Sequence, residues 1–154
     1  MISALKSPWF YGRIFVGLVF AYAGFTKLSA PIENFRGVLT HYEIIPYAFV
    51  PWIAAILPWI EITAGSFMIL GYAPRLSAVV LAGLCAGFLL VLGTSDELIK
   101  GAQDCGCFGE GSLIRLSARQ VFALDIFNFL LALKLYSIKN HPLSLDGRLS
   151  RKAG

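Results

Sequence analysis

The sequence predicts an all-α integral membrane protein, a bundle of four transmembrane helices with both termini in the cytoplasm. Two observations predict this fold class. The chain of 154 residues is 57% hydrophobic and 14% charged, with a mean hydropathy of +0.71, whereas a soluble domain is about 25% charged. Its apolar residues also gather into four blocks, each close to the roughly 20 residues that an α-helix needs to cross a bilayer.

The first block, residues 9–28, is expected to be a retained membrane span. Ala21 and Ala23 resemble the small-residue cleavage site of a signal peptide. The apolar core of a signal peptide is only about 7 to 15 residues long, however. This block contains Arg13 and continues to a lysine, Lys27. We therefore expect a transmembrane helix here.

The remaining blocks are residues 47–70, 74–93 and 117–136. The connection between the second and third blocks is tight, which predicts that these two helices are antiparallel neighbours. The two longer connections, 29–46 and 94–116, then lie together on the opposite side of the membrane from the termini.

The distribution of basic residues predicts which side is which. Eight lysines and arginines lie on the side of the termini and five on the side of the long connections, and the side richer in them is normally cytoplasmic. The long connections therefore face the periplasm of a bacterial inner membrane, with residues 1–139 as one domain in the lipid bilayer and 140–154 as a basic cytoplasmic tail. Because the basic residues are scattered between apolar blocks, the net charge of +4 does not indicate a nucleic-acid partner.

The most specific motif is GAQDCGCFGEG, residues 101–111, in the second outer connection. Cys105 and Cys107 are separated by one glycine, which allows the sharp turn that a disulfide between them requires. So short a ring departs from preferred disulfide geometry and is easily reduced. Because the periplasm lacks the reducing pool of the cytosol, the motif predicts a labile redox pair with Cys105 and Cys107 as catalytic residues. The supporting residues are Asp104, Gly106, Phe108 and Gly109.

Other interpretations of this loop stay open. A structural disulfide that closes so short a loop stabilises little, because the stabilisation grows with loop length. A soft-metal site of Cys105, Cys107 and His41 is less favoured, because structural zinc usually has four ligands. His41 and His141 are expected on opposite sides of the membrane, so we expect no bis-histidine haem within one chain.

Ionisable side chains at depth form a second candidate site. Glu61, Asp125 and Cys85 fall near the middle of the bilayer at a rise of about 1.5 Å per residue. A charge there costs at least about 2.5 kcal/mol, so it needs an interior partner or stays protonated. For Glu61 two interpretations stay open, a proton or quinone site and a hydrogen bond between helices. For Asp125 the structural interpretation is favoured, and Cys85 is expected to behave as a small hydrophobe.

Two basic residues of the first block complete this intramembrane set. Arg13 lies close to the cytoplasmic boundary, where its long stem can snorkel. A pair between Arg13 and Glu61 would have to bridge a difference in depth. Lys27 closes the block at its outer end. Glu61, Asp125, Arg13 and Lys27 together are the candidate residues for a quinone head or a proton.

These patterns together resemble the MauE branch of the MauE/DoxX family of small four-helix membrane proteins. The first block has that family's arginine, spaced glycines and closing lysine, in RIFVGLVFAYAGFTKL. The second has a mid-helix glutamate, Glu61, followed by Gly65, Gly71 and Arg75, and the outer connection has CGCFG at residues 105–109. The resemblance covers most of residues 9–136.

The resemblance implies a role beside periplasmic thioredoxin-like proteins, as in the maturation of methylamine dehydrogenase. We therefore predict a membrane thiol-disulfide oxidoreductase that passes electrons between a periplasmic thioredoxin-like partner and a membrane carrier, for which quinone is the candidate. The direction of electron flow stays open. One alternative is a non-enzymatic assembly or soft-metal transport subunit. Another, implied by DoxX and DoxD relatives, is a quinone-linked subunit of a sulfur-compound oxidoreductase.

Overall fold

The computed structural model describes residues 8–40, 42, 44–94 and 116–138, and every regular element within these ranges is helical. Four helices are long and apolar enough to cross a membrane. They are α2 (Pro8–Ser29), α4 (Val50–Leu70, which follows the 3-10 turn η1 at Tyr47–Phe49), α5 (Pro74–Gly93) and α7 (Ala118–Ser137). The predicted all-α membrane fold is confirmed. Three predicted spans differ from their helices by no more than one residue at either end, and the predicted span 47–70 covers both η1 and α4.

Short local signals set the ends of these helices. Pro51 and Pro74 stand in the first turns of α4 and α5, where the missing N–H would have had no partner in the helix. Gly71 ends α4 with a φ of 68°, a left-handed conformation that glycine adopts without strain. Ser117 caps α7: its hydroxyl accepts from the Gln120 N–H at 3.4 Å, and the Gln120 side chain accepts from the Ser117 N–H at 3.0 Å.

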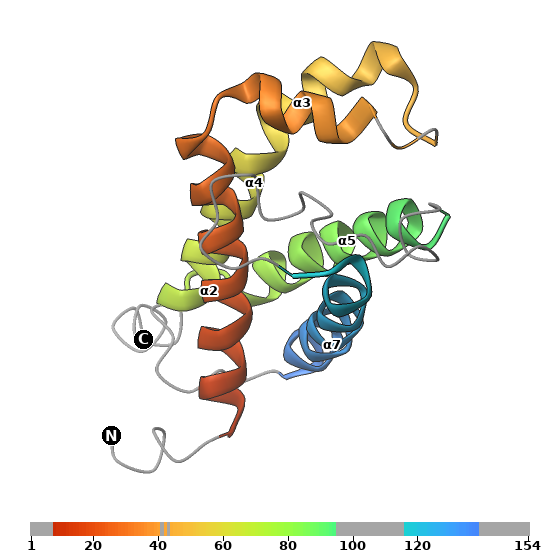
Figure 1. Cartoon of the computed structure of the whole chain (residues 1–154). Helices are drawn as coiled ribbons and strands as arrows, with labels where there is room; N and C mark the ends of the chain where they lie inside the picture. The colour runs from red at the N-terminus through yellow and green to blue at the C-terminus, as the bar shows by residue number, and fades with distance from the viewer. Residues whose placement is uncertain (1–7, 41, 43, 95–115, 139–154) are drawn as a thin grey trace.

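A shorter helix, α3 (Ile32–Thr40), lies in a stretch for which the sequence predicts only a connection. Its buried residues, Phe35 and Leu39, are one turn apart. Both pack on Val50 and Ala54 in the first turns of α4. α3 therefore covers the outer part of the α2 and α4 pair, as Figure 1 shows.

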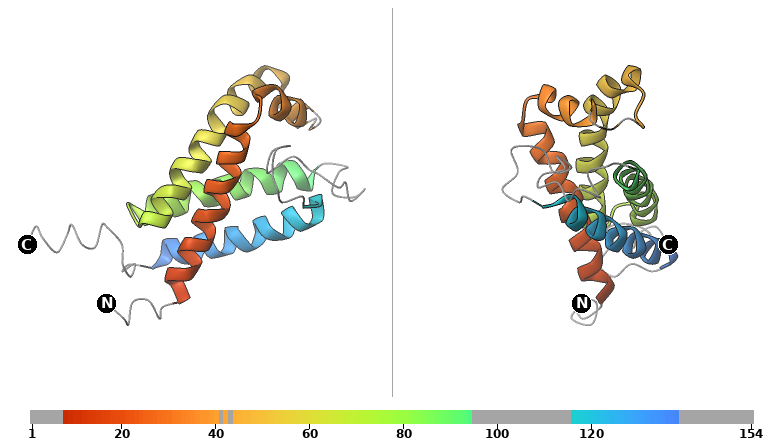
Figure 2. Two further views of the ribbon diagram at one scale, coloured as in Figure 1. Left: turned by 60° about the vertical axis from the view of Figure 1, so that its left-hand side comes forward. Right: turned by 45° about the vertical axis from the view of Figure 1, so that its right-hand side comes forward.

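The long helices associate as two pairs, α2 with α4 and α5 with α7 (Figures 1 and 2). The left view of Figure 2 shows α4 and α5 diverging from the turn that joins them. They were predicted to be antiparallel neighbours, and they do touch, but each packs more extensively on another helix. The reason is that the glycine-rich face of α2 admits α4 at very short range, which leaves α5 to pack mainly on α7.

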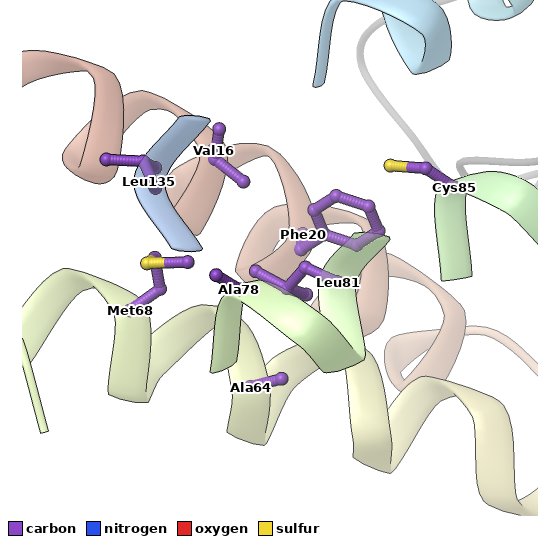
Figure 3. Packing of buried hydrophobic residues seen from close by; sticks show 8 residues of the cluster. All are labelled: Val16, Phe20, Ala64, Met68, Ala78, Leu81, Cys85 and Leu135. Atoms are coloured by element: carbon purple, nitrogen blue, oxygen red, sulfur yellow. The ribbon is translucent and has the colours of Figure 1, made fainter. Parts of the chain in front are cut away.

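Two clusters of buried side chains hold the pairs together. The first, which we call the inner cluster, draws on all four long helices and consists of Val16, Phe20, Ala64, Met68, Ala78, Leu81, Cys85 and Leu135 (Figure 3). It joins the first half of α2 to the end of α7, so these two helix ends lie at the same end of the molecule. That arrangement is what an even number of spans requires.

The second cluster, the outer cluster, lies at the opposite end and consists of Tyr42, Leu92, Ala118 and Val121. It joins the end of α5 to the beginning of α7. The side chains of Val38 and Ile45 also pack against it, so the chain that follows α3 is tied to the same place. The end of α5 and the beginning of α7 therefore lie side by side at this cluster.

Candidate functional site

A buried ion pair joins α2 to α4. The Lys27 Nζ donates to Glu61 Oε1 at 2.6 Å and to Glu61 Oε2 at 2.8 Å. Both side chains are only 1% exposed, so the pair is removed from both lipid and water. In a medium of low polarity such a pair attracts strongly, and loss of either member would leave an uncompensated buried charge.

Two aromatic rings flank the same ammonium. The Lys27 Nζ lies 5.2 Å from the centre of the Phe35 ring of α3 and 5.1 Å from that of the Phe88 ring of α5. Both distances are within the range in which the electron-rich face of an aromatic ring attracts a cation. Four elements, α2, α3, α4 and α5, therefore meet at one charged atom, and we call Lys27, Glu61, Phe35 and Phe88 the ammonium site.

Gly24 allows the close approach of α2 and α4 that brings Lys27 to Glu61. A Cβ on Gly24, one turn before Lys27, would lie 2.7 Å from the Pro58 carbonyl oxygen and 2.7 Å from the Ile62 nitrogen. The two backbones are thus in direct contact beside Glu61, as small residues permit in membrane helices. A bulkier residue at position 24 would push α4 outward and lengthen the bond from Lys27 to Glu61.

A second polar group belongs to α7. Asp125 is 7% exposed and Asn128 is fully buried, and a spacing of three residues places them on one helix face. Asp125 lies within electrostatic range of Lys27 and Glu61, and Cys85 of α5 lies within range of Asp125. Three of the four predicted intramembrane residues, Lys27, Glu61 and Asp125, are therefore brought together.

Arg13, the fourth, is placed elsewhere. Its side chain is 2% exposed, and its guanidinium carbon lies 5.5 Å from the centre of the Phe10 ring, one turn towards the start of α2. It packs inside the protein, whereas we had expected it to snorkel. Glu61 forms its ion pair with Lys27 and not with Arg13. The sequence alone does not predict that partner.

The CGC motif lies outside the described residues, together with the whole set Asp104, Cys105, Gly106, Cys107, Phe108 and Gly109. His41 of the alternative metal site lies outside them as well. Within the described ranges, no group of three or more histidine, cysteine or acidic residues is placed to hold a metal. The two ends of the motif's connection, Thr94 and Leu116, are described. Leu116 packs against the outer cluster, and Thr94 follows its member Leu92 by two residues.

Sequence reasoning missed three members of these sites: Phe35, Phe88 and Asn128. Phe88 carries no signal of its own, because a phenylalanine in an apolar span can also face lipid, and Phe35 lies in a stretch predicted only as a connection. Asn128 did carry a signal, since it is a polar residue three positions after Asp125 in a predicted span. The spacing of Asp125 and Asn128 could have identified that face of the helix.

The helices and the ammonium site define a class, a small four-helix membrane protein whose first two spans are joined by a buried ion pair. The chain belongs to the MauE family: residues 5–137 match the family model described as "Methylamine utilisation protein MauE".

Two curated relatives are similar over part of their length. The methylamine utilization protein MauE of Methylophilus methylotrophus is 31% identical over 97 residues, which is 63% of this chain and 50% of the relative. Its counterpart from Paracoccus denitrificans is 29% identical over 99 residues, 64% of this chain and 53% of the relative. The chain thus spans about half the length of the relatives that it matches. No solved structure matches it.

Proposed function

We propose that this protein is a membrane thiol-disulfide oxidoreductase that exchanges electrons, through Cys105 and Cys107, with a thioredoxin-like protein in the periplasm. Its place in the cell would be the inner membrane, with the CGC motif on the outer face. The names of its relatives support methylamine utilisation as the pathway, in which an exported enzyme would receive its disulfides.

The observation that supports this proposal most is the base from which the CGC connection extends. Leu92 near the end of α5 and Ala118 at the start of α7 pack together with Tyr42 in the outer cluster. Because Leu92 and Ala118 belong to one cluster, the two ends of the CGC connection lie close together beside α3. α3, beside this base, offers further surface for a partner.

The reaction that we propose begins with a CGC disulfide. A thiolate of the reduced partner attacks one sulfur of the Cys105–Cys107 bond, which breaks and releases the other as a thiolate. The partner's second thiolate then attacks the mixed disulfide, so the partner leaves oxidised and the CGC pair stays reduced by two electrons. A quinone accepts those two electrons and two protons, becomes a hydroquinone, and restores the CGC disulfide.

The test is to trap the mixed disulfide. In a Cys107→Ser variant the lone Cys105 thiolate can attack the disulfide of the oxidised partner, and the motif then has no second thiol to resolve the mixed disulfide. Cys105→Ser is the matched reverse. We expect one of the two variants to form an adduct with a thioredoxin-like protein, visible on non-reducing gels and lost on reduction. Cys85→Ala, which leaves the motif intact, is the control and should form none.

Two results together would show that the proposed thiol exchange does not occur. If neither serine variant yields an adduct, and the wild-type motif stays reduced under oxidising conditions, the motif does not exchange disulfides and the proposal is wrong. Metal bound in a one-to-one ratio and lost in Cys105→Ser would then support the soft-metal alternative.

A further inference from the structure

Asn128 is the most unusual buried group in the described part of the chain. It is fully buried near the middle of α7, yet neither its Oδ1 nor its Nδ2 has a hydrogen-bond partner among the described residues. Buried amide groups are nearly always paired, because a buried amide without a partner loses the hydrogen bonds that it makes to water in the unfolded chain. At this depth the surrounding lipid offers no hydrogen bond to compensate.

Asp125 shares this condition on the same face. Its Oδ2 is buried and has no hydrogen-bond partner within the described ranges. Together, the two side chains present a carboxyl oxygen, an amide oxygen and an amide N–H₂ one turn apart. Such a set can both donate to and accept from one small polar group.

The residues around Asp125 and Asn128 restrict which small polar group can bind there. Cys85 of α5 lies within electrostatic range of Asp125, and Phe88 and Phe129 pack against the cluster that contains Cys85. One carboxyl and one thiol are too few ligands for a metal, in agreement with the absence of a metal-binding group in the described ranges. A quinone head has carbonyl oxygens that accept from an amide N–H, and its hydroquinone form has hydroxyls that donate to an amide or carboxyl oxygen, so it fits these groups without a metal.

We propose that Asp125 and Asn128 of α7, opposite Cys85 of α5, bind the head of a quinone. A ligand at this depth has to be soluble in lipid, and it has to bring its own hydrogen-bonding atoms. The quinone carbonyl accepts from the Asn128 Nδ2, and the hydroquinone hydroxyl donates to the Asn128 Oδ1 or to Asp125. The choice of ligand rests on the proposed function, whereas the site rests on the unpaired groups.

The test uses the full-length protein in detergent and a photoreactive short-chain benzoquinone, with labelled peptides located by mass spectrometry. We expect label on α5 and α7 around these residues, removed by excess unlabelled quinone. Asn128→Leu should lower it at least tenfold. Asp125→Asn, which keeps both donor and acceptor, should preserve most of it. Phe127→Leu, a change on the exposed face of the same helix, is the matched control.

The possible results separate the site from the proposed function. Label that is absent, lies on other helices, or persists in a folded Asn128→Leu variant overturns the quinone site. A thermal melt shows whether that variant is folded, and Asn128→Gln, which retains the amide, provides a second variant that should restore labelling. If label is found here but the serine variants form no adduct, the site stands and the thiol-exchange function is wrong.

Discussion

The Lys27 ammonium is held by one carboxylate and two aromatic rings, each from a different helix. Its contacts are two hydrogen bonds to Glu61, at 2.6 and 2.8 Å, and rings at 5.1 and 5.2 Å. Burial of two charges is costly, and the attraction between them offsets that cost only when both are present. The ion pair therefore contributes more to the specific packing of α2 on α4 than to the net free energy of unfolding.

A double-mutant cycle tests this interpretation of the ion pair. Lys27→Met and Glu61→Leu, each made alone, should destabilise the protein by about 3 to 5 kcal/mol, because each leaves one buried charge without its counterpart. The double variant replaces both charges by apolar groups and should be less destabilised than either single variant. Equilibrium unfolding in mixed detergent micelles measures all four free energies.

Additive effects would contradict this view. If the two single losses simply sum in the double variant, Lys27 and Glu61 do not interact. Phe35→Leu keeps an apolar side chain beside the ammonium but removes the ring. It therefore measures the contribution of the cation–π interaction between Lys27 and Phe35. That contribution should be about 0.5 to 2 kcal/mol.

The pair of α2 and α4 depends on backbone contact at two levels. A Cβ on Gly17 would lie 2.8 Å from the Gly65 carbonyl oxygen, and one on Gly65 would lie 2.6 Å from the Ala21 nitrogen. The contact at Gly24, beside the ammonium site, is as tight. Since no real Cβ fits at such distances, the helices have to separate if any of these glycines is replaced.

Alanine substitutions therefore give a sharp comparison. Gly24→Ala and Gly65→Ala should each cost about 1 to 3 kcal/mol, because the added methyl group meets backbone atoms that cannot turn aside. Gly87→Ala is the matched control on α5, where a Cβ would meet nothing within 4 Å. It should change stability by less than about 0.5 kcal/mol.

The measurement is again unfolding in detergent, with helix content checked by circular dichroism. Equal effects at Gly24 and Gly87 would show that the close approach of α2 and α4 does not hold the structure together.

The spans could be predicted from the sequence because a membrane requires a long apolar run, and such runs are visible in the residues themselves. α3 could not, since its nine residues bury only Phe35 and Leu39 and its helical form depends on packing against α4. Which helices pack against each other could also not be predicted from the sequence. It depends on which face of α2 carries close-packed glycines, whereas the length of the connection between α4 and α5 suggested a different neighbour.

At the scale of the whole molecule, the two ends have different characters. The end with the start of α2 and the end of α7 is held by the inner cluster (Figure 3). The opposite end has α3, the outer cluster and both attachment points of the CGC connection. Lys27, near the end of α2, links that outer end to the buried acid Glu61. We propose that this end faces the periplasm.

Labelling from one side of the membrane tests the orientation. A membrane-impermeant maleimide added to intact spheroplasts should label Cys105 and Cys107 after mild reduction. A cysteine placed in the tail by Ser150→Cys, in a background without the other three cysteines, should react only after the membrane is permeabilised. Labelling of the tail cysteine in intact spheroplasts would reverse the orientation.

The sequence predicted part of the candidate site for a similar reason. Glu61, Asp125 and Lys27 could be singled out because charges are rare in a membrane span and stand out in any sequence. Their grouping could not be deduced, because it depends on helix rotation, which a single sequence does not define. Phe88 is the clearest case: only the packing of α5 against the ammonium site distinguishes it from phenylalanines that face lipid.

We propose that Cys105 and Cys107 act as one redox pair linked to a membrane carrier. A redox titration of the purified protein, followed by mass shift after thiol alkylation and repeated with a short-chain benzoquinone, tests it most directly. We expect both thiols to change together in a single two-electron step, and quinone to oxidise the reduced pair while Cys85 stays a thiol. Cysteines that titrate independently, or that stay reduced in the presence of quinone, would contradict it.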